Sequence, residues 1–127
     1  MPDFPTGARI SPSSSKVIWL TDQTTPFTPV SIYGSGSLDF LFVLSQSNSY
    51  RVVVTIDNQV VVDSTFDELS SLPEEVHNVA AWYDSEYGKY LLYLSDFSFS
   101  RNIKIDIIHT TSQLTIDIVF SKVDVMV

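Results

Sequence analysis

Two histidines are the side chains in this sequence best suited to moving a proton or binding a metal ion. His77 follows the proline- and glutamate-containing segment 73–76, and His109 follows the apolar stretch 103–108. A zinc site needs three or four converging ligands, and two isolated histidines do not provide that spacing. The chain has no cysteine, which excludes disulfides and thiolate-bound metals. We therefore predict turn positions for both histidines, no metal site and no cofactor.

A serine nucleophile or a phosphate-binding loop is the next chemistry to consider, because Ser35 lies between two glycines. The nucleophile turn G-x-S-x-G and the dinucleotide-binding loop both lead into a helix, whereas the residues after Gly36 alternate as in a strand. A Ser–His–Asp triad assembled from distant segments stays open, but neither histidine has a supporting local motif. The segment DSEYG (84–88) holds ligands for a small calcium loop, but the same residues form ordinary hairpin turns. We predict no catalytic residue and a protein that is not an enzyme.

Charge and composition point away from nucleic acids and membranes. The formal net charge is −8, from 15 acidic and 7 scattered basic residues, whereas phosphate contacts need clustered Lys and Arg. No apolar run is long enough to span a membrane, and the first residues do not resemble a signal peptide. Charged residues make up only 17% of the chain, while Ser and Thr are abundant. Such a surface favours contact with other proteins or an extracellular location.

Short apolar segments with period-two alternation recur about every 8–12 residues, which is typical of a β-sandwich. We predict an all-β fold, an antiparallel β-sandwich or jelly roll, formed by residues 16–127 as one domain. Residues 1–15 contain three prolines and a serine run, and we expect a flexible N-terminal arm. One short helix is expected over 64–72, where Thr65 and Glu68 have capping-box spacing. The expected strands are 16–21, 30–33, 38–44, 50–56, 59–63, 79–83, 90–94, 103–108 and 114–120.

Alternation and turn chemistry predict how several of these strands are arranged. Asp57 and Asn58 both tolerate positive φ and predict a two-residue hairpin turn. Segments 103–108 and 114–120 are expected to pair as a second hairpin, with Lys104 opposite Asp117. The apolar segment 123–127 is expected either within a sheet or in an oligomer contact. Two sets of side chains should each share one face of a strand, namely Leu38, Phe40, Phe42 and Leu44, and Leu114, Ile116, Ile118 and Phe120.

Aromatic residues are the best candidates for recognition. Five of them lie within twelve positions, so some must point outward from alternating strands. They could fill the core, anchor a protein interface or stack on sugar rings. Saccharide sites usually add a planar cluster of Asn, Asp and Gln beside the ring, and that cluster is not evident here, so protein contact is favoured over sugar. The candidate interaction residues are Trp82, Tyr83, Tyr87, Tyr90, Phe27 and Phe4.

Two strand-and-turn motifs lie between residues 32 and 120, about two thirds of the chain. The first consists of Gly34, Gly36 and Leu38 followed by the segment TIDN (55–58). The second consists of Phe99 followed by the segment IKIDI (103–107). Together they resemble β-rich accessory proteins of phage and other viral particles. The sequence departs from that pattern at Asn58, where glycine is more usual, and in an insert over 68–82. The resemblance implies a non-enzymatic virion part, such as a decoration, tail or capsid-associated protein, and it carries no catalytic residue.

These observations predict a structural or interaction protein that self-assembles or docks on a capsid or tail. Its partners are expected to be proteins, including copies of itself in a homo-oligomer for which a trimer is one option. On this reading the protein is located in the virion. The alternative function is a carbohydrate-binding module or lectin that uses the surface aromatics, and a small ligand carrier is a third.

Overall fold

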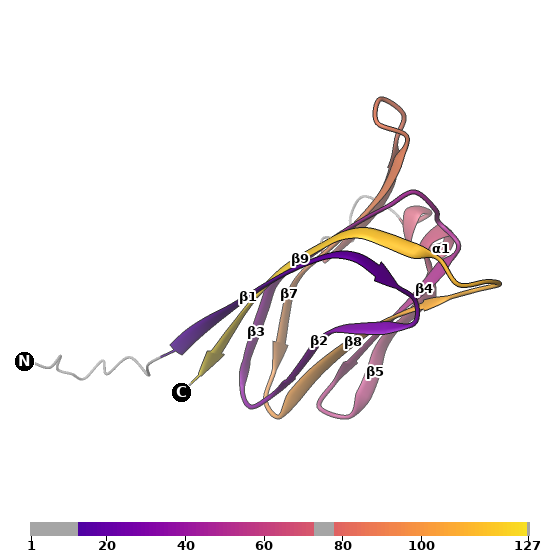
Figure 1. Ribbon diagram of the computed structural model, residues 1–127. Coiled ribbons are helices and arrows are strands. Elements are labelled where there is room, and N and C mark those ends of the chain that lie inside the picture. The colour runs from indigo at the N-terminus through magenta and orange to yellow at the C-terminus, as the bar shows by residue number, and fades with distance from the viewer. Residues whose placement is uncertain (1–12, 73–77, 127) are drawn as a thin grey trace, which may run out of the picture.

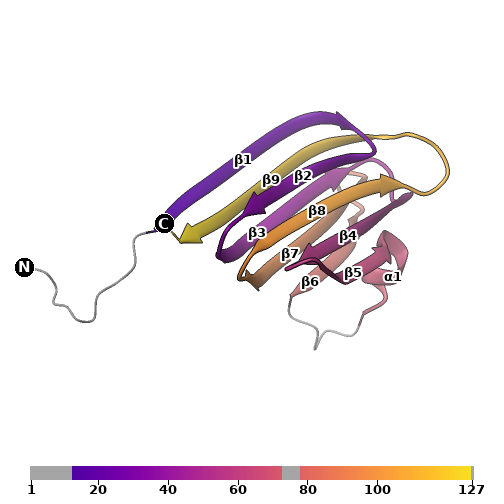
Figure 2. The ribbon, with the colours of Figure 1, turned by 90° about the horizontal axis from the view of Figure 1, so that it is seen from below.

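The part of the chain that the structure describes forms nine antiparallel strands in two facing sheets (Figures 1 and 2). The computed structural model describes residues 13–72 and 78–126, and it confirms the predicted all-β sandwich with one short helix. The elements are β1 (Ser13–Thr24), β2 (Phe27–Tyr33), β3 (Gly36–Ser45), β4 (Tyr50–Ile56), β5 (Gln59–Thr65), α1 (Phe66–Ser70), β6 (Val79–Asp84), β7 (Lys89–Phe99), β8 (Asn102–His109) and β9 (Thr115–Met126).

The strand order is that of a jelly roll. One sheet has the order β1-β9-β3-β7-β6 and the other has the order β2-β8-β4-β5. The pairs are nested along the chain, because β1 pairs with β9, β2 with β8, β3 with β7 and β4 with β5. Eight strands in two interleaved sheets define the jelly roll, and β6 extends the first sheet beyond β7. The hairpin of β6 and β7 stands out from the rest of the sandwich in Figure 1.

The core lies between the two sheets and is formed by aliphatic side chains from both. β-branched residues dominate its four-stranded side, as expected for strands whose inward face is fully buried. Fully buried members include Val30, Leu41, Val43, Val52, Val54, Leu92, Leu94, Ile103, Ile105, Ile107 and Val119. Ser121 joins this inner face, and its buried Oγ has no hydrogen-bond partner among the described residues.

Irregularities in β3 and β9 reverse part of the face pattern predicted by strict alternation. The pairing of these strands shifts register between Leu38 and Phe40, and again between Ile116 and Ile118. An extra residue at such a bulge moves every later side chain to the opposite face of the strand. Leu38 and Ile116 are therefore buried, whereas Phe40 and Ile118 lie on the outer side. The prediction that each apolar set shares one face was wrong for both strands.

The predicted hairpin between 103–108 and 114–120 was also wrong, because β8 and β9 belong to different sheets. Lys104 does not reach Asp117 and instead lies 3.8 Å from Asp106. Asp117 binds Lys89 of β7 at 2.5 Å. The jelly-roll path explains the error, since a chain that alternates between sheets separates segments that look like hairpin partners in sequence.

The C-terminal end of the described chain agrees with expectation, whereas the N-terminal end differs from it. β1 begins at Ser13, so residues 13–15 of the expected arm belong to the sheet and pair with Asp124, Val125 and Met126. The remaining arm residues lie outside the described part of the chain. The apolar C-terminal segment lies within the sheet, as one of the two alternatives predicted, because β9 extends to Met126 between β1 and β3.

The helix α1 is shorter than predicted but begins where the capping box indicated. The Glu68 backbone N–H donates to Thr65 Oγ1 at 3.2 Å, and the Thr65 N–H donates to Glu68 Oε1 at 2.8 Å. Phe66 and Leu69 are buried against the core, so these two contacts and the cap fix the helix against one end of the sheets.

Asp57 joins two turns at one end of the sandwich. Both Asp57 and Asn58 have positive φ, 52° and 67°, as predicted for the two-residue turn between β4 and β5. The Asp57 carboxylate accepts hydrogen bonds from the backbone N–H groups of Ser100, Arg101 and Asn102, at 3.0, 2.6 and 3.2 Å. The Arg101 N–H does most to lower the pKa of Asp57, and partial desolvation opposes it. This carboxylate therefore ties the β4–β5 turn to the β7–β8 turn.

We expect Asp57→Asn to lower the melting temperature at pH 7, because a neutral amide oxygen accepts these bonds more weakly and an NH2 group replaces Oδ2, which also accepts from the Ser100 N–H. The folded carboxyl has a pKa below its ordinary value of 3.8, so its stabilisation is present above about pH 4 and is lost as the pH falls through the folded pKa. Circular dichroism melts should show a difference between wild type and variant that shrinks from pH 7 to about pH 3. Glu86→Gln, in the exposed β6–β7 turn, is the control. An equal difference at both pH values would contradict this role.

Tyr50 carries a buried hydroxyl that has no hydrogen-bond partner among the described residues. Its ring is fully buried and lies 5.7 Å from the ring of Phe66. Burial raises the pKa of Tyr50 far above its ordinary value of 10.0, so the hydroxyl stays protonated at neutral pH.

We expect Tyr50→Phe to stabilise the protein by about 1 kcal/mol, because it removes an unpaired polar atom without leaving a cavity. Urea unfolding at pH 7 gives the free energy directly. Tyr90→Phe is the matched control, since Tyr90 also packs on Phe66 but is only half-buried. A decrease in stability for Tyr50→Phe would show that the hydroxyl has a partner.

Candidate protein-interaction surface

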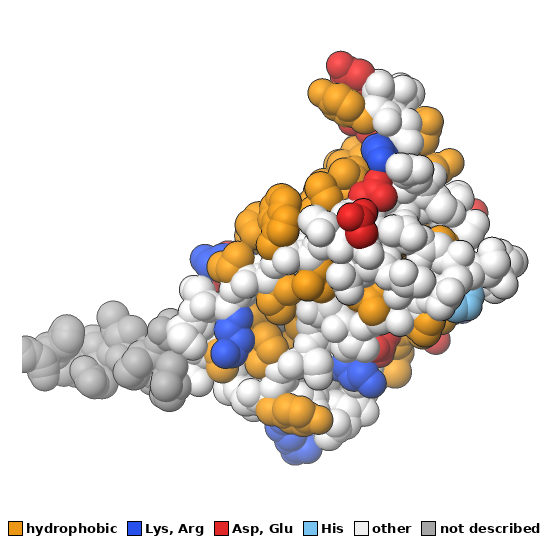
Figure 3. All heavy atoms as spheres, viewed as in Figure 1, with side chains coloured by type: hydrophobic (Ala, Val, Ile, Leu, Met, Phe, Trp, Pro, Cys, Tyr) orange, Lys and Arg blue, Asp and Glu red, His pale blue; other side chains and the backbone are white. Residues whose placement is uncertain are grey.

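The outer side of the five-stranded sheet is an apolar surface. Side chains from all five strands contribute to it, because the bulges in β3 and β9 turn large residues outward. We call this surface the outer apolar face. Its members are Val17, Trp19, Phe40, Phe42, Leu44, Ala80, Trp82, Leu91, Tyr93, Ile118 and Phe120. Figure 3 shows hydrophobic side chains gathered along this side of the molecule, at the upper left.

Aromatic rings form the centre of the outer apolar face. Trp19, Phe120, Phe42 and Tyr93 occupy paired positions on four neighbouring strands. The ring of Phe120 lies 5.0 Å from that of Trp19 and 5.2 Å from that of Phe40, both in edge-to-face geometry. Phe40 is also stacked with Tyr93 at 6.4 Å. These contacts hold the rings in a preformed array, so little side-chain freedom remains to be lost when a partner covers them.

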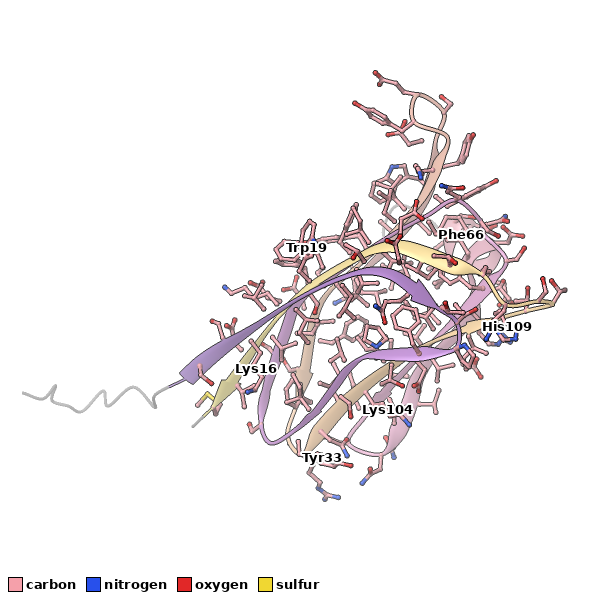
Figure 4. All side chains as sticks on the ribbon, viewed as in Figure 1. Lys16, Trp19, Tyr33, Phe66, Lys104 and His109 are labelled. Carbon is pink, nitrogen blue, oxygen red and sulfur yellow. The ribbon has the colours of Figure 1, made fainter. Side chains whose placement is uncertain are left out.

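Several members of this face remain open to solvent. Val17 and Trp19 are 60% and 59% exposed, and Trp82 and Tyr93 are 43% and 37% exposed. Trp19 points away from the sandwich in Figure 4. A contiguous apolar surface of this kind on a folded domain is a candidate interaction site.

The sequence of the central strands has the pattern of a sheet covered on both sides. β3 contains the unbroken apolar run 40–44, β7 contains 90–94 and β9 contains 118–120. Continuous apolar runs are typical of strands buried on both faces, and alternation is typical of strands with one wet face. β8 provides the contrast, because Lys104 and Asp106 alternate with buried isoleucines along it. The central strands of the five-stranded sheet thus carry large apolar side chains on both faces, whereas β8 of the four-stranded sheet carries Lys104 and Asp106 on its outer face.

Paired charges lie at both ends of the outer apolar face. At one end, Lys122 lies 3.3 Å from Asp39 and 4.0 Å from Asp124. At the other end, Lys89 binds Asp117 at 2.5 Å. Each end therefore carries both signs of charge beside the apolar rows, which is the polar rim expected around an interface core.

The structure separates the aromatic residues that the sequence singled out. Trp82 belongs to the outer apolar face, whereas Tyr83 points to the opposite side of β6 and packs on Tyr90 with ring centroids 4.7 Å apart. Tyr87 is 71% exposed in the β6–β7 turn. Phe27 is half-buried against the core at the start of β2. Phe4 lies outside the described residues. Trp82 and Tyr83 therefore do not form one flat platform.

The most exposed ring of the outer apolar face, Trp19, was not among the candidates from sequence, and neither were the phenylalanines beside it. The available signal was the unbroken run 40–44, which a one-sided strand would not need. Strict alternation assigned Phe40 and Phe42 to the same face as Leu38 and so concealed that signal.

The groups with possible chemistry have structural roles where the structure describes them. His109 Nδ1 lies 3.1 Å from Thr25 Oγ1, but this threonine is fully buried and its hydroxyl also bonds to the backbone of Leu114. The 84–88 segment is a hairpin turn, in which Asp84 Oδ1 accepts the Glu86 N–H at 2.9 Å. No group of three His, Cys, Asp or Glu side chains converges within 13–72 and 78–126. His77 lies outside these ranges.

Comparison with known proteins does not assign a family, so the proposed function rests on the geometry of the outer apolar face. No protein-family model matches the chain, and no curated protein matches it significantly. Among the described residues, no helix is long and apolar enough to cross a membrane.

Proposed function

We propose that this protein is a non-enzymatic assembly protein of a viral particle, and that it self-associates through the outer apolar face. The observation that carries the proposal is the exposure of Trp19, Trp82 and Tyr93 on a sheet whose central strands are apolar on both sides. The expected occupant of this face is the same face of a second copy.

The size of the face supports a stable contact. An aromatic side chain offers about 150–250 Å² of surface, so the outer apolar face presents about 600 Å² when its half-buried members are included. The charged rim extends this area towards the roughly 800 Å² per partner of a standard interface. Contact between identical faces is isologous and gives a twofold dimer, which can serve as the unit of a larger assembly.

Charge supports a second copy as the partner. The net charge of −8 makes two copies repel each other through most of their surfaces. At the outer apolar face, Lys122 and Lys89 each lie beside a carboxylate, so neither end of this face carries acidic side chains alone.

Two further observations support a place in a viral particle. Jelly-roll domains are the building blocks of many viral capsids. The strand-and-turn motifs beginning at Gly34 and Phe99 resemble those of virion accessory proteins. Because one fold serves many functions, these two points support the particle role by analogy, while the surface supports self-association directly.

Sedimentation equilibrium from about 1 to about 200 μM tests the proposal. We expect a monomer–dimer equilibrium that tightens between about 0.05 M and about 0.5 M NaCl, because salt screens the repulsion between acidic chains but not apolar contact. A strict monomer throughout would overturn self-association, and a trimer would overturn the twofold contact. Mass spectrometry of gradient-purified particles tests the virion role, which fails if the chain is missing from them.

A further inference from the structure

We propose that the outer side of the four-stranded sheet holds a binding site for a neutral saccharide, in a groove beside Tyr33. This site lies on the other sheet from the outer apolar face and does not depend on self-association. The groove has a volume of about 340 Å³, within the range of small-ligand sites. Its lining comes from β2, β4, β8 and the β4–β5 turn, with Tyr33 and Lys104 visible on the lower side of Figure 4.

Tyr33 supplies an apolar ring for one face of a sugar. It is 82% exposed, more than any other large hydrophobic or aromatic side chain in the described residues. An exposed ring at a strand end has no role in the core, and its flat face is suited to the C–H face of a pyranose. Tyr33 is paired with Asn102 on β8, so an amide lies next to the ring across the two strands.

The second component of the groove is a pair of linked amides. Asn102 Nδ2 donates to Asn58 Oδ1 at 3.0 Å, and the Asn58 backbone N–H donates to Asn102 Oδ1 at 3.3 Å. These bonds fix both side chains in place and leave the Asn58 Nδ2 group without a protein partner among the described residues. Asn58 has φ of 67°, a conformation that glycine adopts without strain, so the turn itself does not require an asparagine. The Asn58 amide is thus held at the groove by Asn102.

Hydroxyl and ammonium groups complete the lining. Ser31 and Thr55 flank Lys104 at paired positions on the neighbouring strands. The groove thus combines amide, hydroxyl and ammonium donors with amide and hydroxyl acceptors, the mixture needed to bind the several hydroxyls of a sugar. Lys104 lies 3.8 Å from the Asp106 carboxylate, so an acid lies beside this cation and the groove does not require an anionic ligand. The net charge of −8 further disfavours acidic saccharides.

A printed array of neutral and acidic glycans, followed by NMR titration with each neutral glycan that binds, tests this site. We expect binding of neutral glycans with shifts at the side-chain amides of Asn58 and Asn102. Tyr33→Ala should weaken binding at least about ten-fold, and Tyr33→Phe should retain it because the ring is kept. Asn58→Gly should also weaken binding without unfolding the turn. Tyr87→Ala, which removes another exposed tyrosine, is the matched control and should bind as wild type.

Several results would overturn the site. These are no binding of neutral glycans at millimolar concentration, binding that survives Tyr33→Ala, and binding that is lost with Tyr87→Ala. Binding restricted to acidic glycans would also overturn it, since attraction to Lys104 would then replace ring stacking. Sedimentation of the Tyr33→Ala variant separates the two proposals, because this change should leave the monomer–dimer equilibrium unaltered.

Discussion

Replacing Trp19 with lysine is expected to leave the protein folded but monomeric at concentrations where the wild type dimerises. Trp19 is 59% exposed on the edge strand β1, so a lysine can extend into water in the single copy. In the dimer the tryptophan contributes about 3 kcal/mol per copy by burial, and its loss alone weakens association more than about 100-fold. The lysine adds the cost of removing an unpaired charge from water.

Tyr33→Lys is the matched control for Trp19→Lys. It makes the same kind of change at an exposed aromatic position, but on the other sheet. Sedimentation equilibrium should give a monomer for Trp19→Lys and the wild-type equilibrium for Tyr33→Lys. If both variants dimerise as the wild type does, the outer apolar face is not the contact. If both are monomeric, charge on any surface prevents association and the face has no special role.

Alanine substitutions at the neighbouring residues Leu41 and Phe42 should affect different properties. Leu41→Ala should mainly lower the stability of the monomer, and Phe42→Ala should mainly weaken association. Leu41 is fully buried between the sheets, so Leu41→Ala is expected to cost about 3 kcal/mol of stability through lost burial and the cavity left behind. Phe42 lies on the outer apolar face and is only half-buried, so Phe42→Ala should cost about 1 kcal/mol in the monomer. Phe42→Ala should affect association more than monomer stability, because it removes a ring from the centre of the contact.

Urea unfolding at low micromolar concentration measures the stability of the monomer, and sedimentation at higher concentration measures association. The register of β3 makes this pair of variants informative, because strict alternation from Leu38 would place Phe42 in the core and Leu41 outside. A larger loss of monomer stability for Phe42→Ala than for Leu41→Ala would contradict the bulge between Leu38 and Phe40.

Much of the fold could be predicted because its signals are local. The Asp57–Asn58 turn, the Thr65–Glu68 capping box and the position of most strands depend on residues close in sequence. The partners of β8 and β9 could not be predicted in this way. Both strands alternate regularly, and only the path of the chain through two sheets decides that β9 pairs with β1 and β3.

The candidate surfaces were harder to predict than the fold, for two physical reasons. A bulge of one residue at Asp39 moves Phe40 and Phe42 to the opposite face of β3, and no residue type at this position predicts such a bulge. The groove at Tyr33 joins residues from β2, the β4–β5 turn and β8, about seventy positions apart at the extremes. The aromatic residues at 82–93 are close in sequence, which favoured them as one site, yet Trp82 and Tyr83 face opposite sides of β6.

The two sheets of the sandwich turn their outer sides in opposite directions. When two copies join through their five-stranded sheets, four layers stack to a thickness of about 30 Å between the outermost sheets. The grooves at Tyr33 then open in opposite directions, one on each outermost sheet of this stack. If both proposals hold, the dimer carries two saccharide sites that face in opposite directions, and it would be suited to cross-linking two separate glycosylated particles.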